Sequence, residues 1–223
     1  MNTKISGYPN SYLEVQLNKG EEFIVEKGGM IFTDGTYELE TKIEAKTVNN
    51  WIAKIIGGKS LTYNIYKAKS HLTMMFAPSK NADLFEIDVQ KEDSILIEAD
   101  VHFGRTTGLN LLLAKQGIKN TLNDGIKLRT DGSGILFLMG FGKILKTEIN
   151  SDQPILVDQD ALIAYDECLE IKTISKGLKE LVTSGEGYLF EIKGKGRIWL
   201  QTRQEETKSS GGGLISSILD IFR

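Results

Sequence analysis

The sequence predicts an all-β protein: a double-stranded β-helix or β-prism-like body with an internal pseudo-three-fold repeat and a few short helices. Three observations indicate this fold class. Three stretches of the chain align with one another without gaps, apolar and polar residues alternate along them, and 23 glycines stand against 3 prolines. Alternation with period two is typical of strands with one buried face, and glycine-rich turns suit hairpins.

Each aligned stretch contains an alternating strand, a polar turn, three apolar residues and a closing acid. The last apolar residue of the first strand precedes the apolar triplet by the same spacing every time. The triplets predict strands that are buried on both faces or enter the core. The stretches are residues 14–26, 86–98 and 146–158, and their triplets begin at Phe23, Ile95 and Ile155.

The closing acids Glu26, Glu98 and Asp158 are interpreted as solvated strand ends or turn formers. An alternative stays open, in which pseudo-symmetry gathers the three acids around one pocket.

A second pattern, Gly-x-small-apolar-x-aromatic, recurs at residues 58–63, 132–137 and 185–190. Glycine pairs follow in the second and third copies, Gly140 with Gly142 and Gly194 with Gly196, and they predict hairpin turns. Short stretches before the three hairpins are helical or irregular by pattern, at residues 48–56, 115–122 and 175–182.

Units of this size cannot bury both faces alone, so we expect them to stack around one axis. The predicted organisation is a single β body over residues 1–205, with segments at about 10–78, 79–145 and 146–205. A flexible Gly/Ser linker at 206–213 and an amphipathic C-terminal helix at 214–223 follow.

The C-terminal helix needs a surface to dock on, because a free helix of this length is marginal in water. That surface is its own body or a neighbouring subunit; the alternative is a protein partner or a membrane surface. The candidate docking residues share one helical face and are Leu214, Ile215, Ile218, Leu219 and Phe222.

Charge and cysteine usage exclude several classes of protein. The net charge of −3 offers no basic field, so we expect no nucleic-acid partner. The single Cys168 excludes an internal disulfide and is interpreted as a small buried apolar residue in a reducing compartment. The N-terminus has no apolar signal core and no apolar run approaches the ~20 residues that span a bilayer, so we expect a soluble, cytoplasmic protein.

No catalytic or metal-binding constellation is recognisable. Gly58-Lys-Ser60 approaches a phosphate loop, but Ala53 stands where that loop needs glycine, and the alignment makes these residues a hairpin start. His71 and His102 lie in different strand contexts. We therefore predict no catalytic residue, no metal, no cofactor and no enzymatic activity.

Residues 185–203 resemble the closing signature of the family named for altered inheritance of mitochondria, member twenty-four. The signature Gly-x-Gly-(Arg/Lys)-(Val/Ile)-Trp-(Leu/Val)-Gln is met at residues 194–201, and residues 20–30 and 58–61 match further motifs. The resemblance spans about residues 10–205, and residues 110–130 depart from it by being longer and poorer in glycine. It implies a fold similar to the tryptophan RNA-binding attenuator protein, an association of eukaryotic relatives with the mitochondrial inner membrane, and no known activity.

We therefore expect a non-enzymatic scaffold or binding module that self-associates as a homo-oligomer or docks partners through its C-terminal tail. The alternative, by analogy with the attenuator protein, is a small-ligand or RNA-binding protein. An enzyme with a site between the segments ranks third.

Overall fold

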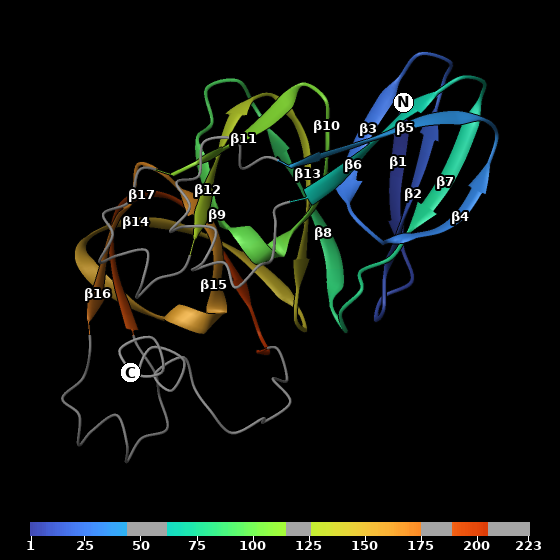
Figure 1. The fold of residues 1–223 in the computed structure, drawn as a ribbon. Helices are drawn as coiled ribbons and strands as arrows, with labels where there is room; N and C mark the ends of the chain where they lie inside the picture. Colours follow the sequence, from blue (N-terminus) through green and yellow to red (C-terminus); the bar gives the residue numbers. More distant parts are fainter. Residues whose placement is uncertain (44–61, 115–125, 175–188, 205–223) are drawn as a thin grey trace, which may run out of the picture.

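A computed structural model describes residues 1–43, 62–114, 126–174 and 189–204, and the structural statements below concern these residues. They form seventeen strands and two 3₁₀ helices, η1 (Ala99–Val101) and η2 (Gln159–Ala161), so the prediction of an all-β protein is confirmed. The strands make three antiparallel sheets (Figure 1). No helix among the described residues is long and apolar enough to cross a membrane.

The first sheet has four strands and carries the N-terminus. Its strand β2 alternates between buried and half-buried residues, because apolar side chains at every second position face the core. The order is β1 (Asn2–Ser6), β2 (Tyr12–Leu17), β7 (Leu72–Phe76), β4 (Met30–Asp34).

The second sheet combines strands of the first and second predicted segments. All three apolar residues of its strand β3 are buried, as the triplet pattern predicts. The order is β5 (Tyr37–Ile43), β6 (Thr62–Ala68), β3 (Glu22–Glu26), β10 (His102–Thr106), β13 (Gly134–Gly140), β8 (Asp83–Val89).

The third sheet combines strands of the second and third segments. Its long strand β14 fuses the alternating strand and the triplet, with a register shift between Ser151 and Ile155 where Pro154 lacks an N–H donor. The order is β11 (Leu109–Leu113), β12 (Lys127–Gly132), β9 (Ile95–Glu98), β15 (Leu162–Asp166), β17 (Leu189–Gln201), β14 (Ile144–Asp158), with β16 (Glu170–Ile174) also on β17.

Three apolar clusters hold the sheets together. The first contains the fully buried rings of Phe23, Phe76 and Phe137, with Phe23 centroids 6.0 and 5.8 Å from the other two. The second surrounds Ile97 and the third Phe190. Each such side chain contributes about 1.5–3 kcal/mol by leaving water, which makes these clusters the main stabilising term.

The alternating part of each aligned stretch pairs antiparallel with a strand that follows it in the chain. The residues that end the alternating strands lie opposite β7, β13 and β17: Leu17 opposite Leu72, Val89 opposite Gly134, and Ile149 opposite Gly196. Pairings between segments run from the first to the second and from the second to the third. The stacking of the segments around one axis stays a prediction, as does the attenuator-like fold.

The predicted hairpin turns at the glycine pairs are wrong: Gly194 and Gly196 lie within strand β17, and β13 and β14, on either side of Gly140 and Gly142, lie in different sheets. The predicted alignment is also wrong for the second segment. Phe137 lies on β13, opposite Glu86 and Gly104, and so takes the place of Trp199 in the third segment. Phe190 lies nearer the start of β17, opposite Val157. The glycine pair equivalent to Gly194 and Gly196 is therefore Gly132 and Gly134, because Gly134 lies opposite Val89 as Gly196 lies opposite Ile149.

Several predicted features lie outside the described residues. These are the helical stretches at 48–56, 115–122 and 175–182, the hairpin start Gly58-Lys-Ser60, the linker at 206–213 and the C-terminal helix at 214–223.

Candidate functional site at the strand edges

Two kinds of strand meet where neighbouring segments join. We name β3, β9 and residues 155–158 of β14 the triplet strands. We name β4, β10 and β15 the bulged strands, because each has a register shift against its partner strand, β7, β13 and β17 respectively. The triplet strand of one segment pairs with the bulged strand of the next, β3 with β10 and β9 with β15, and we call each such pairing a joint.

The first joint depends on a glycine. Gly104 lies opposite Val25, and a Cβ atom on it would come within 2.9 Å of the Ile24 carbonyl oxygen and 3.3 Å of the Phe23 ring. Such close approach of two backbones leaves no room for a side chain. Gly104 thus lets β10 lie flat against β3.

A buried arginine lies beside this glycine. Arg105 is 2% exposed, its Nε donates to the Leu109 carbonyl oxygen at 3.0 Å, and its guanidinium carbon lies 4.6 Å from the centre of the Tyr63 ring. Stacking a desolvated guanidinium on an aromatic face contributes up to about 2 kcal/mol.

The second joint holds a buried ion pair in the corresponding place. Lys127 is almost fully buried and its Nζ donates to Glu98, while the same Nζ lies 5.7 Å from the ring centres of Tyr165 and Phe190. By strand register Tyr165 corresponds to Arg105 and Lys127 to Tyr63. Each joint therefore places a cation near an aromatic ring, but the two have changed places. The cation is on the bulged strand in the first joint and the aromatic ring is on the bulged strand in the second.

A second ion pair ties the bulged strand β15 to its surroundings. The Arg197 backbone N–H donates to Asp166 Oδ2 at 2.7 Å, and its Nη2 lies 2.8 Å from Asp166 Oδ1 and 3.0 Å from Asp93 Oδ1. The hydrogen bond to Asp166, opposed by burial, raises the pKa of Arg197. Asp93 belongs to the turn before β9, so Arg197 bridges both strands of the second joint.

A histidine at the first joint is held neutral. Burial, and then the charge of Arg105, lowers the pKa of His102 to about 3. Its Nε2 lies 3.4 Å from Arg105 Nη1. A neutral imidazole here accepts from the guanidinium, which is a structural role.

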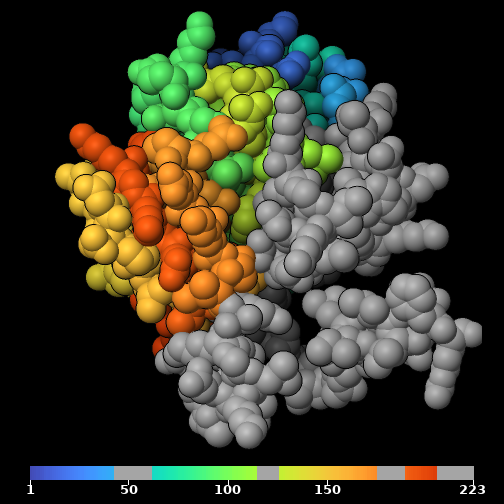
Figure 2. All heavy atoms as spheres, turned by 90° about the vertical axis from the view of Figure 1, so that its left-hand side faces the viewer, coloured from blue at the N-terminus to red at the C-terminus, as the bar shows by residue number. Residues whose placement is uncertain are grey.

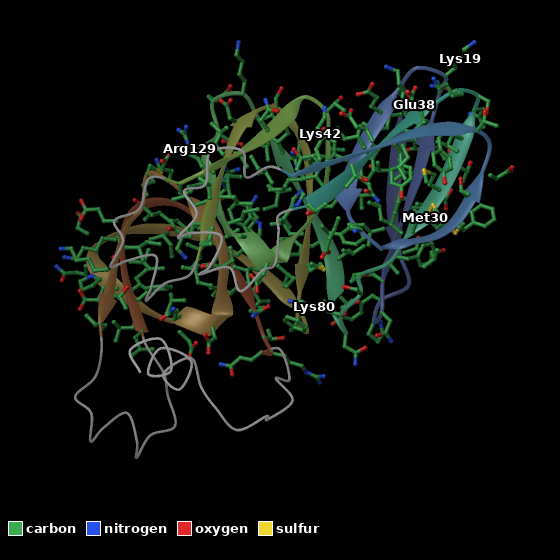
Figure 3. The ribbon with its side chains drawn as sticks, viewed as in Figure 1. Lys19, Met30, Glu38, Lys42, Lys80 and Arg129 are labelled. Atoms are coloured by element: carbon green, nitrogen blue, oxygen red, sulfur yellow. The ribbon has the colours of Figure 1, made fainter. Side chains whose placement is uncertain are left out.

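The bulged strand β4 has one open edge. Among the described strands it pairs with β7 alone, and its residues Met30, Ile31 and Phe32 are 38%, 61% and 45% exposed (Figure 3 labels Met30). The residues that correspond to Phe32 by register, Gly104 and Ala164, are buried inside the two joints. Strand β4 therefore carries a large apolar side chain where its counterparts are covered.

The triplet strand at residues 155–158 has the complementary open edge. Among the described strands it pairs with β17 alone, and Leu156 is 57% exposed, whereas the corresponding Ile24 is 8% exposed. Figure 2, which faces this end of the molecule, shows the β14 atoms in yellow at the surface. Strands β4 and β14 lie at opposite ends of the row of sheets (Figure 1).

A separate hollow of about 840 Å³ lies among the connecting loops. Its lining includes Tyr8, Phe141, Lys143 and Arg203, together with Lys80, which Figure 3 labels. Asp83 also lines it, but its carboxylate accepts from the Ser11 N–H at 3.0 Å. The hollow thus combines three basic side chains with two aromatic ones.

The closing acids have separate structural roles. Glu98 pairs with buried Lys127, so its interpretation as a solvated strand end is wrong, while Asp158 accepts from the Asp160 N–H and caps η2.

The interpretation of Cys168 as a buried residue is also wrong. The residue is exposed, with Sγ 3.2 Å from the Lys195 carbonyl oxygen. The predicted docking residues Leu214, Ile215, Ile218, Leu219 and Phe222 lie outside the described residues, so no contact of theirs is observed.

Sequence reasoning missed Arg105, Lys127 and the exposed run Met30-Ile31-Phe32. The signal was available, because extending the alignment past the closing acids places residues 30–34 beside 102–106 and 162–166. A run of apolar residues at the position of Gly104 and Ala164 would then have stood out.

Comparisons with known proteins agree with this fold. A family model described as mitochondrial biogenesis AIM24 matches residues 3–203. No curated protein matches the chain. A structural-genomics crystal structure of a Streptococcus pyogenes protein is similar, with a TM-score of 0.71 and 16% identity, over 100% of this chain and 99% of that chain. At this identity the similarity concerns the fold alone.

Proposed function

This chain belongs to the mitochondrial biogenesis AIM24 family, and from its two open strand edges we propose that it is a non-enzymatic scaffold protein that self-associates. An unpaired strand edge presents a row of N–H and C=O groups that another strand can pair with. The observation that carries the proposal is the coincidence of these edges with exposed apolar side chains, Ile31 at 61% and Leu156 at 57%.

The described side chains support a binding role over a catalytic one. Among them no group of three or more histidine, cysteine, aspartate or glutamate residues is placed to hold a metal ion. The strongly shifted histidine, His102, hydrogen-bonds to Arg105 and lines neither open edge. The charged groups at the two joints are ion-paired or stacked, which is a structural use.

The C-terminal tail is the proposal's second docking element. Its apolar face, Leu214, Ile215, Ile218, Leu219 and Phe222, suits a groove on another protein, with its own oligomer as the first candidate.

The mass of the full chain in solution tests the proposal. We expect light scattering to give a mass above the protomer's 24.8 kDa that rises with concentration. A mass of one protomer at every concentration would overturn self-association. Deleting residues 209–223 tests the tail separately: an unchanged mass and unchanged co-purifying proteins would remove its docking role.

The hollow favours a second candidate function, the binding of a small anionic ligand. Its basic side chains Lys143 and Arg203, together with Tyr8, a residue that is 68% exposed, suit an anion attached to a flat group. Native mass spectrometry of freshly purified protein, with absorbance at 260 nm, tests it. Absence of retained ligand and of salt-sensitive RNA binding would exclude this function.

A further inference from the structure

We propose that the two open edges pair with each other between two copies of the chain, β4 of one copy with residues 155–158 of the next. This contact rests on the proposed self-association and names its partner and its surface. It would be a third joint, made between chains and built like the two joints within the chain.

The two existing joints fix the register of the third. In the first joint Gly104 lies opposite Val25 and Arg105 opposite Ile24; in the second Ala164 lies opposite Ile97 and Tyr165 opposite Leu96. The pairings with β7 and β17 identify the corresponding positions in the open strands. The predicted pairs are Phe32 with Val157, Thr33 with Leu156, and Asp34 with Ile155.

The side chains of the open strands are exposed at the positions that are buried in the two joints within the chain. Ile24 and Ala164 are 8% and 0% exposed within joints, whereas Leu156 and Phe32 are 57% and 45% exposed.

The sizes of the side chains that meet across a joint vary together: where one strand carries a larger side chain, the other carries a smaller one. The large Phe23 meets Gly104 in the first joint, whereas in the second the smaller Ile95 takes the position of Phe23 and Ala164 lies opposite Ile97. In the third, the smaller Ile155 replaces Phe23 and leaves room for Phe32. Pro154, which has no N–H, ends the pairing surface at Ile155.

A second copy is the occupant because one chain cannot close this joint on itself. Strands β4 and β14 lie at opposite ends of the molecule (Figure 1). The contact is head to tail, so each added chain presents a new open edge, and assemblies close as rings or grow as filaments. Strands β1, β5, β8, β11 and β16 are also outermost among the described strands, but none of them is a triplet strand or a bulged strand, the two kinds that pair at the joints.

Disulfide trapping tests the joint. In a Cys168→Ser background, one chain carries Thr33→Cys and another carries Leu156→Cys. Residues directly opposite on antiparallel strands lie within disulfide reach, so mixing the two chains under mild oxidation is expected to give a heterodimer. Each chain alone is expected to stay unlinked.

Leu145→Cys provides the matched control. Leu145 is another exposed leucine of β14, 40% exposed, but it lies outside the triplet strand. It is expected not to cross-link to Thr33→Cys. The pair Asp34→Cys with Ile155→Cys repeats the test in the same register if either first variant fails to fold.

Three outcomes overturn the proposed joint. Homodimers of Thr33→Cys or of Leu156→Cys would indicate a symmetric contact instead. Equal linking of Leu145→Cys would indicate non-specific collision. An absence of both linked pairs would remove the joint; self-association would then stand if light scattering still gives an oligomer, and would fall with it if the mass is that of a protomer.

Discussion

The ion pair between Glu98 and Lys127 shows how one buried charge is made tolerable. The Lys127 side chain is 5% exposed, and the Glu98 carboxylate is its hydrogen-bonding anion. Removing one partner of such a pair leaves a charge in a poorly solvated place. We predict that Glu98→Ala lowers the free energy of unfolding by about 3 kcal/mol, measured by urea denaturation.

An exposed pair gives the matched control for this prediction. Lys67 and Glu22 lie 2.8 Å apart with side chains 48% and 36% exposed, and such pairs are worth about 0–1 kcal/mol. Glu22→Ala should therefore cost little. The double variant Glu98→Leu with Lys127→Met should lose less than Glu98→Ala; equal losses in all three variants would show that the buried charge is not the cause.

His102 makes the stability of the protein depend on pH. The folded chain holds its pKa at about 3, while the unfolded chain has an ordinary value near 6.5, so the unfolded chain binds more protons between these values. Stability is therefore full above pH 6.5 and falls as the pH drops towards 3. Because His102 is half-buried, we predict a loss of about 1 kcal/mol between about pH 7 and about pH 5.

The variant His102→Gln should lack this part of the pH dependence. Thermal unfolding of both proteins at the two pH values measures the difference, and the shared titration of carboxylates cancels. A parallel loss in both proteins would show that His102 does not contribute. An NMR titration of the His102 ring, with exposed His71 as a reference signal, gives the pKa itself.

At the scale of elements, the sequence pattern predicts strands well and their partners less well. Alternation and the apolar triplets locate β2, β3, β8 and β9, because side-chain burial leaves a direct mark on the residue pattern. Glycine pairs mislead for the second segment. Glycine serves turns as well as close strand approach, as Gly104 shows, so a glycine pair does not by itself identify a hairpin turn.

Local composition also fails to predict burial that depends on residues from other strands. Cys168 sits in an apolar context in sequence but is exposed, because the turn between β15 and β16 places it outside the core. Arg105 and Lys127 are buried although their residue types favour the surface. Their burial depends on Tyr63, Glu98 and Tyr165, which come from other strands, so single-strand patterns do not predict it.

At the scale of the whole molecule, the joints turn a row of similar segments into one body. Each joint buries one triplet strand between a strand of its own segment, β6 or β12, and the next segment's bulged strand. A linear row of three segments necessarily leaves one bulged strand and one triplet strand without a neighbour, and here these are β4 and residues 155–158. Long-range pairings of this kind are set by strand register across the chain, which a single stretch of sequence does not contain.

Hydrogen exchange at the two open edges tests the account most directly. If β4 and residues 155–158 pair between copies, their amides become hydrogen-bonded only in the assembled protein. Protection of residues 30–34 and 155–158 should rise together with protein concentration, and Leu156→Asp should abolish the rise at both edges. Exchange that stays equally fast at every concentration, in the presence or absence of that substitution, would contradict the account.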